Sequence, residues 1–443
     1  MYVESLSLRL FWVLLATSLL GWVGPAGATT PRIQHWQMDN GTRVYFVEAH
    51  ELPIVDLQVA FDAGSARDDD THPGLASLTN NLLDQGAGEW SADALAEGLA
   101  RLGAKISTSA ARDMAVVGLR TLAQATTLGP AVDLLTAIVV HPTFPTDACE
   151  RERSNTLTAI EEEKQSPASV ANAAFFGAIY DKHPYAHPPL GTKESVAAFI
   201  REDFVNFHRR LYVGRNAVVA LVGDLDRPAA EALVAHVIGG LPAGEAPPSL
   251  PPVPALPPTA GVETILFPAT QTHVLSGQPG TWRGDPDYFP LYLGNHILGG
   301  NGLVSRISEE VREKRGLSYS AYSESQPMRV AGPFVIGAQT RNDKVAEARQ
   351  VLQQTLEKFV REGPTADELV KAQQNVTGGF ALRLDSNRKV TDYLAMIAFY
   401  VLPLDYLDRF KGRIEAVSVE QIRDAFRRRI DPAHLATVVV GGK

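Results

Sequence analysis

Three residues, Ser77, Asn80 and Asn81, stand in a segment whose spacing is typical of a metal-binding helix. Side chains at positions i and i+4 of a helix share one face, and two histidines with this spacing can bind one zinc ion together. Ser77 and Asn81 have that spacing, but a neutral hydroxyl and a carboxamide are poor zinc ligands. Asn80 cannot accept a proton, so it cannot act as a general base. These three side chains therefore could not form a zinc site with a general base.

The segment Gly74–Gly86 resembles the zinc-binding helix of the pitrilysin/insulinase-type metallopeptidases, the inverzincins. In that family the helix reads G-L-A-H-x-x-E-H, followed by a few apolar residues and a glycine. The resemblance implies that Ser77 and Asn81 replace the two ligand histidines, and that Asn80 replaces the glutamate that activates water. The alternative is an ordinary amphipathic core helix. We favour the family because further landmarks match: Asn40-Gly41-Thr42, Gly64-Ser65, His183-Pro184-Tyr185, Gly191-Thr192 and Gly299-Gly300.

The resemblance places a third zinc ligand, a glutamate, on a later helix, eight residues before a proline. Counting back from Pro167 leads to Ala159, whereas a register shift of two residues would offer Glu161 instead. His183 and His187 also have ligand-like spacing, but the prolines between and after them exclude a regular helix, and we interpret both as loop residues. We therefore expect no metal or other cofactor in this chain.

The resemblance also implies a catalytic role for Arg312 and Tyr319, because the family carries an arginine and a tyrosine seven residues apart at this place. A guanidinium and a phenol can stabilise the negative charge that develops on a peptide carbonyl oxygen during attack. Alternatively, Arg312 lies on the solvated face of the charged run Glu309–Arg315, and Tyr319 is only a packed strand residue. Tyr322 is a nearby phenol, but in a regular strand it would point away from the face that Tyr319 uses.

Each half of the chain shows the same order of predicted elements, which indicates an internal repeat. Each half opens with two strands and a helix: Arg43–Val47, Val55–Phe61 and Gly74–Leu83, then Thr264–Phe267, Thr272–Gly277 and Tyr288–Leu298. Each half ends with a helix that carries an arginine cluster, followed by a β-branched strand and a glycine: Phe199–Leu211 with Asn216–Gly223, and Val419–Ile430 with His434–Gly441. Strands mixed with helices in this way predict an α+β domain, twice.

A proline-rich segment separates the two halves and is predicted to be a stiff, extended linker. We expect a signal peptide at 1–28, an N-terminal peptidase-like domain with a degenerate zinc motif at 29–240, the linker at 241–261, and a C-terminal peptidase-like domain with the Arg/Tyr pair at 262–443. The predicted fold class is α+β, with two homologous domains that each contain a mostly antiparallel sheet packed with helices. The resemblance implies that the two domains form a clam-shell.

Composition excludes several function classes. The 443 residues are 45% hydrophobic, which is enough for a large core and for two or more domains. The formal net charge of −9 and the lack of a long basic run disfavour nucleic-acid binding. Cys149 is the single cysteine, so no internal disulfide can form, and we expect it to be an inert, buried thiol.

The N-terminus is typical of a secretory signal. Arg9 precedes the apolar run Leu10–Leu20, and Ala26-Gly27-Ala28 fits a cleavage site with small residues. An uncleaved membrane anchor is the alternative, but the run is short for a full span. We expect a periplasmic or secreted protein that is not bound to a membrane after the signal is cleaved.

Two functions follow from these predictions. The first is a non-catalytic subunit of an exported, heterodimeric zinc metallopeptidase, in which Arg312 and Tyr319 act at the zinc site of a homologous partner chain. The resemblance supports this division of labour, because some family members pair a zinc-bearing chain with a zinc-less one. The second is a catalytically inert structural or peptide-binding homologue. A self-sufficient peptidase with unusual ligands is a weaker third possibility, because the general base is lost together with the ligands.

Overall fold

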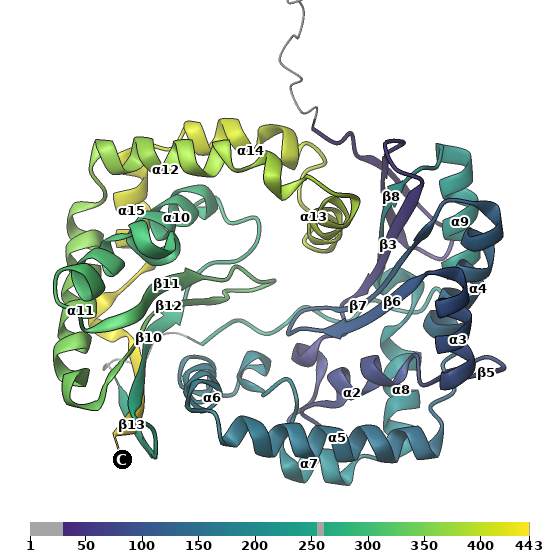
Figure 1. The fold of residues 1–443 in the computed structure, drawn as a ribbon, viewed down its shortest axis with the longest axis horizontal. Helices are drawn as coiled ribbons and strands as arrows, with labels where there is room; N and C mark the ends of the chain where they lie inside the picture. The colour runs from purple at the N-terminus through teal and green to yellow at the C-terminus, as the bar shows by residue number, and fades with distance from the viewer. Residues whose placement is uncertain (1–29, 255–260, 443) are drawn as a thin grey trace, which may run out of the picture. The chain divides into compact units, whose positions relative to one another are not determined.

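Two β-sheets carry the fold, one built from each half of the chain (Figure 1). The computed structural model describes residues 30–254 and 261–442, so the predicted signal peptide at 1–28 lies outside the described residues. The strands of the first sheet are β1 (Gln34–Gln37), β2 (Arg43–Glu48), β3 (Ile54–Phe61), β6 (Lys105–Ala110), β7 (Ala115–Leu122) and β8 (Ala217–Gly223). Those of the second are β9 (Val262–Phe267), β10 (Gln271–Pro279), β11 (Ser318–Ser325), β12 (Pro333–Arg341) and β13 (Ala436–Gly442). A separate short hairpin contains β4 (Gly86–Ala87) and β5 (Trp90–Ser91).

The two sheets have the same strand order. The first runs β2-β8-β3-β7-β6, and the second runs β9-β13-β10-β12-β11. In each sheet the first of these pairs is parallel and the other three are antiparallel. Only β1, which pairs antiparallel with β2, has no counterpart in the second sheet among the described strands. The predicted α+β fold with two similar, mostly antiparallel sheets is therefore confirmed.

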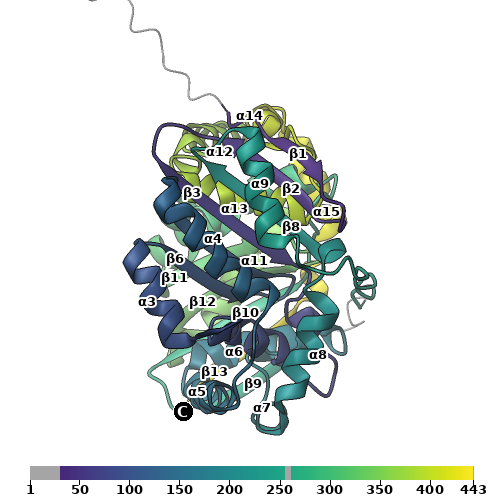
Figure 2. The same ribbon diagram turned by 90° about the vertical axis from the view of Figure 1, so that its right-hand side faces the viewer.

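Helices cover both sheets, and several begin or end where the sequence predicts. Ser91 caps α3 (Ala92–Leu102) by accepting a hydrogen bond from the Ala94 N–H, and Thr365 with Glu368 forms a capping box at the start of α12 (Ala366–Gly378). Figure 2 shows α3, α4 (Ala125–Val140) and α9 (Arg227–Ile238) in front of the first sheet. On the second sheet lie α10 (Tyr288–Asn295), α11 (Val345–Glu362) and α15 (Val419–Arg429). Across residues 30–254 and 261–442, no helix has the length and apolar character that a membrane crossing needs.

The two halves exchange one helix each. The first half contributes α6 (Pro167–Tyr180), which packs on β10 and β13 of the second sheet. The second half contributes α13 (Asn387–Phe399), which packs on β3 and β8 of the first sheet. These strands are equivalent in the two sheets, so the exchange is reciprocal (Figure 1). No local sequence pattern predicts this exchange, which makes the core of each half depend on the other.

The predicted linker follows the surface of the first half as far as the structure describes it. Residues 241–254 form no helix or strand, and Leu250 among them is buried. Arg67 Nη1 donates to the carbonyl oxygen of Pro248 at 2.7 Å, and His183 Nε2 donates to that of Pro251 at 3.1 Å. Residues 255–260 of the predicted linker lie outside the described residues.

Candidate functional site

The helix α2 (Leu75–Leu82) contains the positions that correspond to the zinc ligands. Gly74 precedes it with φ of 96°, and the carboxylate of Asp68 accepts hydrogen bonds from the N–H groups of Gly74 and Ala76, both at 2.8 Å. The carboxylate therefore satisfies donors that an N-terminus otherwise leaves unpaired. Burial raises the pKa of Asp68 to about 8, although the two N–H groups act in the opposite direction.

The loop that precedes α7 (Lys193–Ala198) covers the start of α2. A Cβ atom on Gly74 would lie 2.6 Å from the carbonyl oxygen of Leu190, so the two backbones approach closely. The hydroxyl of Ser77 donates to the carbonyl oxygen of Pro189 at 2.6 Å, and the hydroxyl of Ser195 donates to that of Pro73 at 2.8 Å. Ser77 is only 7% exposed. Ser77, at the position of the first zinc ligand of the family, therefore joins the loop before α7 to α2 by a hydrogen bond.

Asn80 and Asn81 occupy different environments. Asn80 is fully buried, and its Oδ1 accepts a hydrogen bond from the Tyr212 hydroxyl at 3.1 Å. Its Nδ2 is buried and has no acceptor among the described residues. The side chain of Asn81 is exposed. The helix therefore turns one amide into the core and one into solvent, and Asn80 serves packing.

The place of the third ligand lies on α5 (Thr146–Lys164), which packs against α2. Ala159 is half-buried, whereas Glu161 is exposed and pairs with Lys164 at 2.9 Å. Within the described ranges, no group of three His, Cys, Asp or Glu residues could hold a metal ion. A zinc ion does not fit this helix, because Ser77 and Asn81 stand at the two ligand positions, and neither a hydroxyl nor a carboxamide replaces an imidazole or carboxylate ligand.

His183 and His187 lie in a loop with a short 3-10 turn, as predicted. His183 is 3% exposed, and its Nδ1 accepts the N–H of Tyr185 at 3.1 Å. His187 lies 3.3 Å from the carboxylate of Asp70. Cys149 is likewise buried, and burial raises the pKa of its thiol, as an unreactive cysteine requires.

Arg312 lies on η6 (Ser308–Glu313), a π-helical segment that packs against β11. π-helical segments are rare in proteins, and those that occur often lie at functional sites. The Arg312 guanidinium lies 3.4 Å from the carboxylate of Glu313, and its side chain is 34% exposed. The next basic residues are held more tightly: Lys314 and Arg315 both bind the carboxylate of Glu310, at 2.7 and 2.6 Å. Of the three cations Arg312, Lys314 and Arg315, Arg312 therefore has the longest ion-pair contact and is the least constrained by the fold.

Tyr319 lies on β11, the edge strand of the second sheet, and is 87% exposed. The register with β12 shifts between Ser318 and Ser320, so Tyr319 is the extra residue of a β-bulge. The prediction that Tyr319 and Tyr322 occupy opposite faces assumed a regular strand, and the bulge makes that assumption wrong. Tyr322 instead packs in the cluster that α6 forms with the second sheet. No hydrogen bond joins Arg312 and Tyr319 in the described part of the chain, although their elements are in contact.

A buried aspartate that the sequence analysis missed ties the two halves together. Asp113, between β6 and β7, is 3% exposed. Its carboxylate accepts hydrogen bonds from the hydroxyls of Tyr185 at 2.5 Å and Tyr400 at 2.8 Å, and from the N–H of Arg329 at 2.8 Å. Tyr400 and Arg329 belong to the second half of the chain. Burial raises the pKa of both tyrosines, so both remain protonated donors. No local pattern around Asp113 signals partners this distant in sequence.

The two-sheet fold and the altered helix α2 define a class: zinc-peptidase-like proteins that lack the metal ligands. Residues 43–193 match the family described as Insulinase (Peptidase family M16), and residues 198–376 match the family described as Peptidase M16 inactive domain. The chain therefore belongs to the M16, or insulinase, peptidase family. The predicted resemblance is confirmed.

Related proteins agree with this assignment over nearly the whole chain. The crystal structure of a peptidase M16 inactive domain from Pseudomonas fluorescens has a TM-score of 0.89 and 37% identity, and covers 93% of this chain and 98% of its own. An uncharacterized zinc protease of Mycobacterium tuberculosis is 27% identical and covers 94% of both chains. A Helicobacter pylori protein described as a non-peptidase homolog is 25% identical over 90% of this chain and 92% of its own. The match to the inactive domain and the likeness to the non-peptidase homolog support a non-catalytic member of the family.

Proposed function

We propose that this chain is the non-catalytic subunit of an exported, heterodimeric zinc metallopeptidase. Arg312 and Tyr319 would stabilise the scissile carbonyl of a peptide at the zinc site of a homologous partner chain. The observation that carries this proposal is the contrast between the two halves. In the first half, Ser77 and Asn80 are committed to the packing of α2. In the second half, Arg312 and Tyr319 remain accessible.

The chemistry that these two residues can supply is electrostatic. Attack on a peptide carbonyl places negative charge on its oxygen, and a guanidinium and a phenol aimed at that oxygen stabilise the charge. Because Tyr319 projects from a bulge on an edge strand, a second polypeptide can approach it without displacing other strands. Bulges commonly redirect a side chain beside active sites.

Export is part of the proposal. Arg9, the apolar run Leu10–Leu20 and the small residues Ala26-Gly27-Ala28 support a cleaved signal that delivers the chain to the periplasm or outside the cell. The partner would be a relative with an intact H-x-x-E-H helix, encoded in the same genome.

The test is peptide cleavage by the complex. The chain is co-purified with the zinc-bearing relative, and Arg312→Ala and Tyr319→Phe are compared with the unaltered complex. Loss of one oxyanion donor typically lowers kcat about 10²–10³-fold. Arg315→Ala and Tyr322→Phe are matched controls, because Arg315 lies just after the end of η6 and is paired with Glu310, and Tyr322 is a packed tyrosine of β11. Full activity of both Arg312→Ala and Tyr319→Phe would refute the proposed role.

A specific observation also favours the second candidate, an inert peptide-binding homologue. Among the described residues, no strand pairs with the outer edge of β6, whose side chains alternate between exposed and half-buried. An open edge of this kind can accept an extended peptide as an added strand. This function predicts that the chain retains an unfolded peptide in a pull-down experiment, and that no relative of the same organism forms a peptidase with it.

A further inference from the structure

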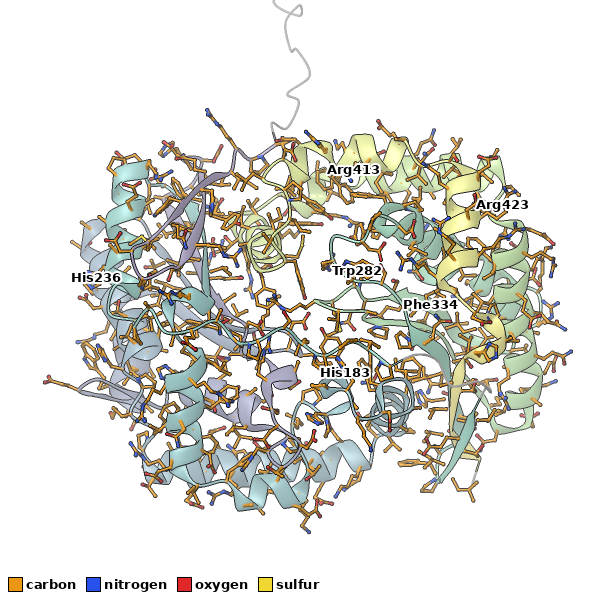
Figure 3. All side chains as sticks on the ribbon, turned by 180° about the vertical axis from the view of Figure 1, so that it is seen from behind. His183, His236, Trp282, Phe334, Arg413 and Arg423 are labelled. Atoms are coloured by element: carbon orange, nitrogen blue, oxygen red, sulfur yellow. The ribbon has the colours of Figure 1, made fainter. Side chains whose placement is uncertain are left out.

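A pocket in the second half carries two arginines without an acidic partner. It lies where α10 and α14 (Tyr406–Glu415) begin, beside the loop between β10 and α10. Arg283, Arg409 and Arg413 contribute cations to its wall, and Tyr288, Phe289 and Tyr406 contribute aromatic rings. Figure 3 shows Arg413 on α14, and Trp282 on the loop next to Arg283.

The acids of this wall are already neutralised. Asp405 pairs with Arg409 at 2.7 Å. The side chain of Asp285 is fully buried, and its Oδ1 accepts from Arg429 at 2.9 Å. Within the described residues, neither Arg283 nor Arg413 forms an ion pair. The pocket therefore presents two positive charges that the fold itself does not compensate.

The surroundings of the two arginines suit a ligand with both an anionic and an apolar part. The Arg413 guanidinium lies 5.5 Å from the ring of Phe289, and Arg283 lies 5.8 Å from the ring of Tyr288. Arg283 donates to the Tyr288 hydroxyl at 3.3 Å, and its buried Nε has no acceptor within residues 30–254 and 261–442. Two helices also begin here, and the positive ends of their dipoles add to the attraction for an anion. A guanidinium binds a carboxylate with paired hydrogen bonds.

The size of the pocket limits the ligand. Its volume is about 220 Å³, below the roughly 300–1,000 Å³ of typical small-molecule sites. One large apolar residue fits such a space better than a nucleotide does.

We propose that this pocket binds the C-terminal end of a peptide, with its free α-carboxylate at Arg283 and Arg413 and its last apolar side chain against Phe289. That the ligand is a peptide rests on the proposed function, whereas the carboxylate and the apolar contact rest on the pocket. Arg312 and Tyr319 do not line this pocket. Binding there needs neither zinc nor a partner chain.

Calorimetric titration of the full chain with N-acetyl-phenylalanine tests the proposal. The free acid is expected to bind at least tenfold more tightly than N-acetyl-phenylalanine amide, which has the same ring and no charge. Inorganic phosphate should compete at least tenfold less effectively than the free acid. Because no peptidase activity is measured, a negative result here leaves the proposed function untouched.

Variants connect the binding to the pocket. Arg413→Gln alters an exposed side chain and should lower the affinity for the free acid to within threefold of that for the amide, with an unchanged melting temperature. Arg283→Gln should act in the same way. Arg361→Gln, an exposed arginine on α11, is the control and should bind like the unaltered chain. Equal binding of acid and amide, absence of binding, equal competition by phosphate, or full affinity of both pocket variants would overturn the proposal.

Discussion

At the scale of residues, two polar side chains of α2, those of Ser77 and Asn80, belong to a packed core. Asn80 accepts the Tyr212 hydroxyl, and the ring of Tyr212 stacks on His208 at a centroid distance of 4.7 Å. His208 in turn donates from Nε2 to the carbonyl oxygen of Val139 at 3.0 Å. A glutamate in place of Asn80 would put a charge into this fully buried site, at a high cost in desolvation.

The same row predicts a dependence of stability on pH. Burial lowers the pKa of His208 from 6.5 to about 4. Because the folded state disfavours the proton, the contribution of His208 is complete above pH 6.5 and is lost as pH falls towards 4. At about 1.36 kcal/mol per pKa unit, the loss is at most about 3 kcal/mol.

Urea unfolding of His208→Gln between pH 7 and pH 4 measures this effect. Glutamine keeps a donor for Val139 but does not titrate, so the stability of the variant should fall less steeply with decreasing pH. His236→Gln, which alters an exposed histidine on α9, should leave the slope unchanged. An unchanged slope in His208→Gln would show that another group dominates.

At the scale of elements, the start of α2 depends on how closely the loop before α7 approaches it. At Gly74 the φ angle is positive, and an added Cβ atom would lie 2.6 Å from the carbonyl oxygen of Leu190. Backbone conformation and lack of space therefore both disfavour a side chain at this position. Gly103, which ends α3 at φ of 62°, has a similar conformation but open space around it. The sequence alone does not show which of the two glycines has a close backbone neighbour. The folded loop before α7 makes that difference.

The two glycines form a matched pair for mutagenesis. Gly103→Ala should lower the unfolding free energy by about 1–2 kcal/mol, the cost of the left-handed conformation. Gly74→Ala should add an overpacking cost of about 1–3 kcal/mol, because backbone atoms of Leu190 and Gly191 would have to move. Denaturant unfolding of both variants measures the difference between their unfolding free energies. Equal losses of unfolding free energy would mean that the loop before α7 moves away from position 74 at no cost.

At the scale of the whole described chain, the two halves cannot be treated as independent. The exchange of α6 and α13 places a helix from each half on the sheet of the other. Asp113 adds a buried carboxylate bonded to residues from both halves. Hydrogen bonds to a charged group contribute about 1.5–3 kcal/mol each to stability, so this contact is substantial.

Asp113→Ala should therefore destabilise the chain by about 3 kcal/mol or more, since two tyrosine hydroxyls and one N–H lose their acceptor. Asp385→Ala removes an exposed carboxylate paired with Lys389, and it should change stability by less than about 0.5 kcal/mol. Unfolding followed by tryptophan fluorescence measures both variants. A loss of less than 1 kcal/mol in Asp113→Ala would contradict the view that Asp113 holds the halves together.

Much of this protein could be predicted from local pattern. The strands β2, β3, β8 and β10, the caps of α3 and α12, and the repeat of the two halves follow from periodicity and capping residues, which act over a few positions. The sequence also shows that Ser77 and Asn81 carry no imidazole or carboxylate and that Asn80 cannot act as a general base, because side-chain chemistry does not depend on the fold.

The tertiary structure alone decided the rest. The bulge that exposes Tyr319, the contact of the Ser77 hydroxyl with Pro189, and the bonds of Asp113 to the second half all join residues whose separation no local pattern encodes. The exchange of α6 and α13 is of the same kind. Such contacts form only when distant segments are brought together to bury their apolar faces. The sequence shows which face of an element is apolar, but it does not show which other element that face packs against.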